Sequence, residues 1–292
     1  MDKKLAVHRY KLHQRERIKK ERNYIRYTMN GTILITGASG NLGGKVAYEL
    51  LPSGIPLKVA GRTKDKLVAF EGKTEVLCGS LEDEAFLNTA LDNVQAVFLV
   101  IPQLQQRTIK EFAELFMRTA EEKGVTHVVN ISNCTLKRYG QWTSLLEFEQ
   151  YLNASTPLHI KHLRCANFFE NLNWGLHTPY LPGIKLPYIS SYEIAHIAAS
   201  YLKNKNFTGK SVDELMGRED YSMQDFANKL GVPYQQQSTS PENSWFFDAF
   251  NTGQYELVQR TLENTSILQE ERFSLDYFLA HHFKQEALNA AI

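Results

Sequence analysis

Three glycines at a regular spacing could hold the phosphates of a nucleotide. Gly37, Gly40 and Gly43 follow the apolar run Ile33–Ile35, and apolar residues recur at helical spacing from Lys45 onward. A strand, a glycine-rich turn and a helix N-terminus in this order bring backbone N–H groups and the positive end of a helix dipole to a pyrophosphate. A glycine turn without a ligand is the alternative, but the flanking strand and helix favour a dinucleotide site.

The end of the next expected strand, Leu57–Ala60, indicates which dinucleotide is bound. An NAD-selective site places an Asp or Glu there to accept hydrogen bonds from the ribose hydroxyls. This chain has neither; it has Arg62, with Lys66 one turn further on. Their cationic donors suit a 2′-phosphate, although both could also be plain surface charges at a helix start. The pattern favours NADP(H) over NAD(H) as the cofactor.

Other chemistries have little support in the sequence. The three cysteines are scattered and form no C-x-x-C pair, so we expect neither a disulfide framework nor a metal site, and a reducing cytoplasmic location. His159 and His162 have no third ligand at metal spacing. No nucleophile-elbow, zinc-protease or P-loop motif is present.

The elements that must position the glycine turn alternate between strand and helix. Expected strands cover residues 33–35, 57–60, 76–81, 96–101, 127–131 and 158–164, and an amphipathic helix is expected over 108–123. Alternation of this kind predicts an α/β fold with a doubly wound parallel sheet, whose ligands sit beyond the carboxyl ends of the strands.

Composition and charge set the remaining limits. The 292 residues are 43% hydrophobic and 22% charged, and no apolar run approaches the ~18 residues of a membrane helix. Residues 1–29 carry ten Lys or Arg against three Asp or Glu. This basic stretch could bind a nucleic acid or an acidic partner, but a solvated, flexible extension is the favoured interpretation, so nucleic acid is an unlikely partner.

Several motifs together resemble one family. The runs T-G-A-S-G-N-L-G, A-G-R-T-K-D-K, V-F-L-V-I-P and L-R-C-A-N-F-F-E-N-L, with later segments around residues 188–195 and 216–227, occur in consistent order between residues 31 and 285. They are similar to the NmrA-like branch of the atypical short-chain dehydrogenase/reductases. The resemblance implies an NADP-binding Rossmann domain over 30–170, with 188–210 returning to it. A smaller, partly helical C-terminal lobe over 171–187 and 211–292 would bind a substrate or a partner.

The resemblance also implies site residues. Positions implied for the cofactor are Gly37, Ser39, Gly40, Asn41, Leu42, Gly43, Arg62, Lys66, Ser80, Leu81, Ile101, Pro102, Ser132, Asn167 and Phe168. Positions implied for the substrate pocket are Tyr139, Trp142, Phe169 and Trp174. Core packing between the lobes is an equally good interpretation of Phe168, Phe169 and Trp174, because aromatic side chains are more often buried than functional.

The expected proton donor is where the chain departs from the family. In the branch, a His and a Lys four residues apart often precede an E-x-E-x-Y segment; here Gln141 and Leu145 stand in those places. Neither can donate a proton near neutral pH. Two functions stay open: an NADPH-dependent oxidoreductase that reduces a quinone or small carbonyl, and a non-catalytic NADP(H) sensor that binds a regulatory protein partner.

Overall fold

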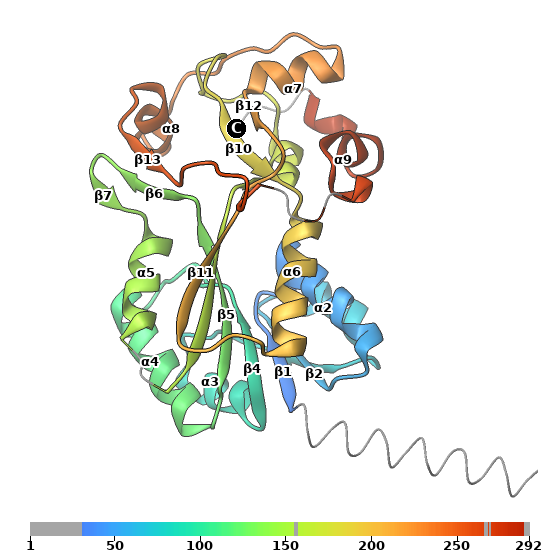
Figure 1. Cartoon of the computed structure of the whole chain (residues 1–292), viewed down its shortest axis with the longest axis vertical. Helices are drawn as coiled ribbons and strands as arrows, with labels where there is room; N and C mark the ends of the chain where they lie inside the picture. The colour runs from blue at the N-terminus through green and yellow to red at the C-terminus, as the bar shows by residue number, and fades with distance from the viewer. Residues whose placement is uncertain (1–30, 155–156, 266–267, 269, 289–292) are drawn as a thin grey trace, which may run out of the picture.

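The centre of the molecule is a seven-stranded parallel sheet (Figure 1). The computed structural model describes residues 31–154, 157–265, 268 and 270–288. The strands of the sheet, in spatial order, are β11 (Lys210–Leu215), β8 (His159–Cys165), β5 (His127–Asn133), β4 (Val94–Leu99), β1 (Thr32–Ile35), β2 (Leu57–Gly61) and β3 (Glu75–Cys78). The chain order reverses between β1 and β4, which opens a crevice at the carboxyl ends of these two strands.

Helices cover both faces of the sheet. On one face, α2 (Asn41–Leu50) packs on β1 and β2, and the neighbouring α6 (Ser191–Asn204) packs on β4 and β5; Val46, Leu50 and Ile194 belong to the core of this face. On the other face lie α3 (Glu84–Leu91), α4 (Ile109–Glu122) and α5 (Ser144–Asn153), as Figure 1 shows. Thr108 begins α4 with a capping box to Glu111, the signal expected at a helix start. The doubly wound Rossmann-type fold is therefore confirmed.

Strand β11 corrects the expected boundary at residue 210 between the Rossmann domain and the C-terminal lobe. β11 lies parallel to β8 in full register from Lys210 to Leu215, so the sheet continues past residue 210, where we expected the C-terminal lobe to resume. Polar residues dominate this strand, and Val212 is 41% exposed because the strand lies at the edge of the sheet. An edge strand of this composition lacks the continuous apolar run that marks the central strands.

A smaller lobe lies above the carboxyl edge of the sheet (Figure 1). It contains two three-stranded sheets, β12–β10–β9 and β13–β6–β7, and the helices α7 (Met223–Leu230), α8 (Ser244–Asn251) and α9 (Leu275–His281). The short strands are β6 (Thr135–Arg138), β7 (Gln141–Trp142), β9 (Asn167–Phe168), β10 (Leu186–Ile189), β12 (Asp220–Tyr221) and β13 (Tyr255–Leu257). Aromatic side chains, among them Phe169, Tyr180, Phe226 and Phe250, form its core.

Two further expectations concerned the basic N-terminal segment and membrane-spanning helices. The basic segment 1–29 lies outside the described residues. Among the helices that the structure describes, none is long and apolar enough to cross a membrane.

Candidate functional site

The glycine turn joins β1 to α2 by bringing backbone against backbone. Gly37 has a φ of +63°, in the left-handed region that favours glycine. A Cβ atom on Gly43 would lie 2.4 Å from the carbonyl oxygen of Gly37 and 2.7 Å from that of Thr36. Because the first turn of α2 rests directly on the end of β1, a side chain at Gly43 would push the helix away. The third glycine therefore sets the approach of helix to strand.

The first turn of α2 presents backbone donors toward the crevice. Gly40 is the N-cap residue and brings no capping side chain. Among the described residues, no carbonyl accepts a hydrogen bond from the N–H groups of Asn41, Leu42 or Gly43. Such orphan donors at the positive end of a helix dipole match the oxygens of a pyrophosphate. The turn therefore fits the diphosphate of NAD(P)H.

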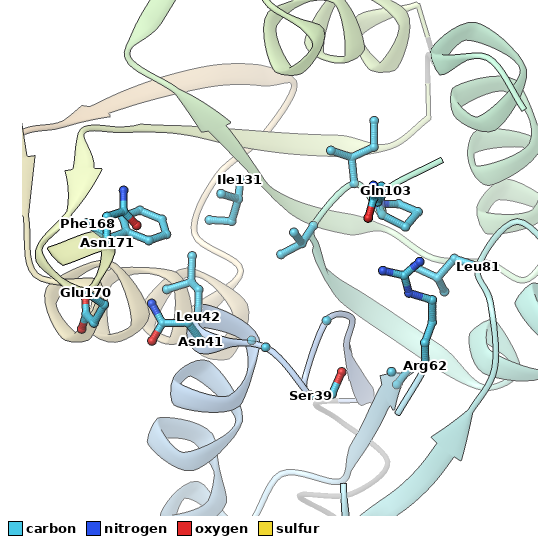
Figure 2. Close-up of a pocket in the computed structure, with 18 of the residues that line it drawn as sticks. Ser39, Asn41, Leu42, Arg62, Leu81, Gln103, Ile131, Phe168, Glu170 and Asn171 are labelled. Carbon is cyan, nitrogen blue, oxygen red and sulfur yellow. The ribbon is translucent and has the colours of Figure 1, made fainter. Parts of the chain in front are cut away.

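Arg62 extends from the end of β2 toward Leu81 (Figure 2). Its side chain is exposed, and within the described part of the chain its guanidinium forms no ion pair. A Cβ on the preceding Gly61 would lie 2.7 Å from Ser39 Oγ, so the glycine turn and this strand end are in close contact. The arrangement places a free cation, and no carboxylate, at the end of the second strand.

One cleft with a volume of about 600 Å³ connects these features to the smaller lobe. The predicted site residues that line it are Gly37, Ser39, Gly40, Asn41, Leu42, Gly43, Arg62, Leu81, Ile101, Pro102, Phe168 and Trp174. Figure 2 shows Arg62 and Leu81 on one side of the glycine turn and Ile131 and Phe168 on the other. The cleft extends from the end of β2 to the 3₁₀ helix Phe169–Trp174.

Five other predicted residues do not line this cleft. Lys66 lies in a 3₁₀ helix beside a separate depression, and Phe169 is buried in the core of the smaller lobe against Tyr188 and Phe278. Asn167 uses its side-chain amide to donate to the carbonyl of Pro187. The two remaining residues are serines. Ser80 Oγ accepts a hydrogen bond from the backbone N–H of Glu82, and Ser132 is buried one residue beyond Ile131, which lines the cleft.

The structure corrects the prediction that Tyr139 and Trp142 line the substrate pocket, because neither residue lines the cleft. They belong to the β6–β7 hairpin, and Trp142 lines a shallow depression with Gln141, on the outside of α5. Leu145 lies in α5 and also outside the cleft. The hairpin turns away because β6 pairs with β13 as well as β7 and follows the smaller lobe. Sequence proximity to the end of β5 therefore misplaced these side chains.

A partly buried ion pair joins α2 to the smaller lobe. Lys45 Nζ in α2 lies 2.6 Å from Glu170 Oε1 and also donates to Asn41 Oδ1 (2.6 Å) and Ser191 Oγ (2.5 Å). Ser191 in turn donates to the same Glu170 oxygen, and the ammonium lies over the Tyr192 ring. Burial lowers the pKa of Lys45, and the carboxylate of Glu170 opposes that shift. The pair therefore keeps both charges in place between two parts of the chain that bound the cleft.

A second carboxylate shapes the loop after β4. Glu82 is buried, and it accepts hydrogen bonds from the backbone N–H groups of Gln105, Gln106 and Arg107 at 2.9–3.2 Å. Burial would raise the pKa of Glu82, but the three N–H donors, together with the Arg107 charge, outweigh it and hold the pKa below its ordinary value. This anchor fixes the segment that begins at the lining residues Ile101 and Pro102.

The sequence did not predict several residues at the outer part of the cleft. These residues are Gln103, Glu170, Asn171, Asn173 and Lys284. Glu170 and Asn171 lie inside the motif L-R-C-A-N-F-F-E-N-L, which offered a signal for them. Lys284 comes from the far end of the chain, where no motif marks it. Asn173 brings it there, because its side chain bonds to the backbone of both His282 and Lys284.

Comparison with known proteins agrees with this geometry. Residues 37–167 match a family model described as NAD(P)H-binding. A Streptomyces griseus protein, a (4-alkanoyl-5-oxo-2,5-dihydrofuran-3-yl)methyl phosphate reductase, is 35% identical over 100 residues. That match covers 34% of this chain and 34% of the relative, so the chain matches about a third of that protein.

Solved structures share the fold over a longer range. The triphenylmethane reductase of Citrobacter sp., complexed with NADP(H), aligns with a TM-score of 0.65 at 18% identity, over 80% of this chain and 93% of that chain. The NADPH-dependent quinone oxidoreductase of Escherichia coli, complexed with NADPH, aligns at 0.59 and 22% identity, over 72% and 80%. NmrA, a negative transcriptional regulator in complex with NAD, aligns at 0.58 and 15%, over 76% and 82%. These likenesses show the fold, and with the matched family model they confirm the predicted resemblance to NmrA-like proteins.

Proposed function

We propose that this NmrA-like chain, with its NAD(P)H-binding domain, is an NADPH-dependent oxidoreductase that reduces a quinone or a small conjugated carbonyl compound. The observation that carries the proposal is the cleft itself. Backbone donors at Asn41 and Leu42 suit the diphosphate, and the same cleft continues to the apolar side chains of Ile131 and Phe168. A nicotinamide ring against these apolar groups would leave the outer part of the cleft for an acceptor.

Preference for NADPH is part of the proposal. Arg62 is a free cation at the end of β2, where a 2′-phosphate would lie, and no carboxylate competes for it there. A guanidinium binds phosphate by charge and by paired N–H donors, and the ribose hydroxyl of NADH offers neither partner. Lys66 lines a neighbouring depression that shares Ser39, Gly40 and Asn41 with the cleft, so its contact with the 2′-phosphate stays a prediction.

The titratable residues of the cleft decide which acceptors are suitable. Among the described lining residues they are Arg62, Glu170 and Lys284, and the set includes no tyrosine, histidine or cysteine. When bound, the nicotinamide would supply a hydride. Reduction of a quinone by one hydride and one proton yields a hydroquinone, and water can supply the proton because a hydroquinone anion is only weakly basic. An acceptor of this type tolerates Gln141 and Leu145 in place of a proton donor.

The names of similar proteins support a reductase reaction. The Streptomyces griseus relative is named as a reductase of a conjugated furanone that carries a phosphate, and two of the aligned structures are named as reductases. Their names supply the class of chemistry proposed here. Cofactor geometry in this chain supplies the reason to apply it.

A non-catalytic NADP(H) sensor is the second candidate. The observation that favours it is the lack, among the described lining residues, of a side chain that ordinarily donates a proton near pH 7. A sensor would bind NADPH through the same glycine turn and transmit binding through Lys45 and Glu170, which connect α2 to the smaller lobe. Its outer surface would then bind a regulatory protein.

NADPH oxidation by the purified full chain tests the two candidates. The chain is mixed with NADPH and with each member of a panel of quinones and aldehydes, and absorbance of the reduced nicotinamide is followed. We expect oxidation with quinones and little with simple aldehydes. Tight NADPH binding with no oxidation across the panel would contradict the oxidoreductase and favour the sensor.

A further inference from the structure

The outer part of the cleft holds side chains that have no partners within the protein. Trp174, at the end of the 3₁₀ helix Phe169–Trp174, is 71% exposed and lines the cleft. Among the described residues its ring contacts no other aromatic ring. A large exposed apolar side chain at a concave site is typical of a surface that a ligand covers. Trp174 therefore offers a flat face to whatever enters beside the cofactor.

Lys284 lines the same part of the cleft from the C-terminal segment. Within the described residues its ammonium forms no ion pair, in contrast to Lys45, whose charge is matched by Glu170. Its backbone is held in place, because Lys284 N–H donates to Asn173 Oδ1 at 2.8 Å and Asn173 Nδ2 donates to the His282 carbonyl at 3.1 Å. These two hydrogen bonds fix the backbone of the segment that brings Lys284 to the cleft.

Two side-chain amides of the cleft also lack partners. Gln103, from the loop after β4, and Asn171, from the 3₁₀ helix, both line the cleft, and in the part of the chain that the structure describes neither side-chain amide forms a hydrogen bond (Figure 2). Glu170 lies next to Asn171, but its negative charge is matched by Lys45. In Figure 2, Asn171 lies on the side of Phe168 and Glu170, whereas Gln103 lies across the cleft, on the side of Arg62 and Leu81. The 3₁₀ helix and the segment bound to it therefore supply an aromatic face, an unmatched cation and one free amide, and a second free amide lies across the cleft.

We infer that this opening binds a flat, conjugated acceptor that carries an anionic group, with the ring against Trp174 and the anion beside Lys284. The inference rests on the proposed oxidoreductase function and specifies its substrate class. Apolar area and a ring face select the flat part of the acceptor. A single ammonium together with amide donors selects a sulfonate, carboxylate or phosphate on it.

Equilibrium binding provides a test that needs no turnover. Naphthalene sulfonate and neutral naphthol are titrated calorimetrically into the full chain saturated with NADP⁺. Lys284→Met removes the ammonium and keeps the backbone bond to Asn173, so we expect about fivefold weaker binding of the sulfonate and unchanged binding of naphthol. Lys203→Met, an exposed lysine near the end of α6, is the matched control and should change neither.

Trp174→Leu tests the aromatic face. We expect weaker binding of both compounds, because both lose the ring contact. Trp245→Leu, which removes another exposed tryptophan outside the cleft, should leave both affinities unchanged. Equal sulfonate affinity in the wild-type chain and in Lys284→Met, or no sulfonate binding by the wild-type chain, would overturn the inference.

Turnover separates this inference from the proposed function. With naphthoquinone and its sulfonate as acceptors, Lys284→Met should lower kcat/KM for the sulfonate about fivefold and leave the neutral quinone unchanged. If neutral quinones are reduced but the sulfonate gains nothing from Lys284, the function stands and the inference fails. If sulfonate binding depends on Lys284 and no quinone is reduced, the anion subsite stands and the oxidoreductase function fails.

Discussion

The two ends of the cleft are built in different ways. At the glycine turn, residues 37–43 form the wall almost entirely from backbone, and the close packing of Gly43 on Gly37 leaves no room for a side chain. At the opening, Asn171 and Trp174 of one 3₁₀ helix lie with Lys284, which is more than one hundred residues further along the chain, and side chains form this part of the wall. The first end requires the absence of side chains, and the second requires particular ones. Mutations should therefore affect the two ends differently.

The largest effect is expected at the glycine turn. Gly43→Ala places a Cβ within 2.4 Å of the Gly37 oxygen, so α2 must shift away from β1 and its N–H donors must leave their positions. We expect NADPH affinity to fall at least about a hundredfold by calorimetry. Gly183→Ala is the matched control, because nothing lies within 4 Å of the added Cβ. Unchanged affinity in a folded Gly43→Ala chain would contradict the assignment of the turn to the diphosphate.

Loss of the partly buried ion pair between Lys45 and Glu170 should come next. Glu170→Gln leaves the partly buried Lys45 ammonium without its counter-charge, and we expect the free energy of unfolding to fall by about 2 kcal/mol in denaturant titration. The exposed pair Lys229–Asp276 serves as comparison, since Asp276→Asn should cost less than about 1 kcal/mol. Equal losses at both places would show that Lys45 and Glu170 do not hold the smaller lobe to α2.

Arg62→Gln is expected to change cofactor preference. Removal of the guanidinium should weaken NADPH about tenfold, because a charge-assisted contact to phosphate is lost, and should leave NADH almost unchanged. Lys64→Gln, an exposed cation two residues on, provides the control. Equal weakening of both cofactors by Arg62→Gln would rule out Arg62 as the 2′-phosphate ligand.

The smallest effect, and one that depends on pH, is expected at Glu82. Because its pKa is lower in the folded protein than in the unfolded chain, its carboxylate stabilises the fold above the ordinary pKa of a glutamate, and this contribution is lost as the pH falls through the folded pKa. Glu82→Gln should cost about 1 kcal/mol near pH 7, and the difference from wild type should shrink in acid. Glu84→Gln, at an exposed side chain, is the control. A difference that persists unchanged in acid would contradict the role of the Glu82 charge.

The same contrast explains what could be predicted from the sequence. The strands at 33–35 and 57–60 and the turn at Gly37–Gly43 follow from local rules, because continuous apolar runs mark buried parallel strands and glycine spacing marks the turn. Thr108, the N-cap residue, likewise indicated where α4 begins. In each case the residues that form the feature are neighbours in the chain.

Features made by distant residues could not be predicted in this way. Lys45 and Glu170 are 125 residues apart, and no local pattern pairs them. Tyr139 and Trp142 were misplaced because the pairing of β6 with β13, more than one hundred residues further on, carries the hairpin away from the cleft. Lys284 reaches the cleft because the Asn173 amide holds its backbone. Tertiary packing, which the sequence does not display, decided all of these positions.

Direct titration of the full chain with NADPH and with NADH is the measurement closest to the central claim. The claim is that the glycine turn and Arg62 form one NADPH-binding cleft. We predict saturable binding of NADPH that is at least about tenfold tighter than that of NADH, in line with one charge-assisted phosphate contact. No binding of either nucleotide would contradict the claim, and equal binding of both would contradict the place of Arg62 in it.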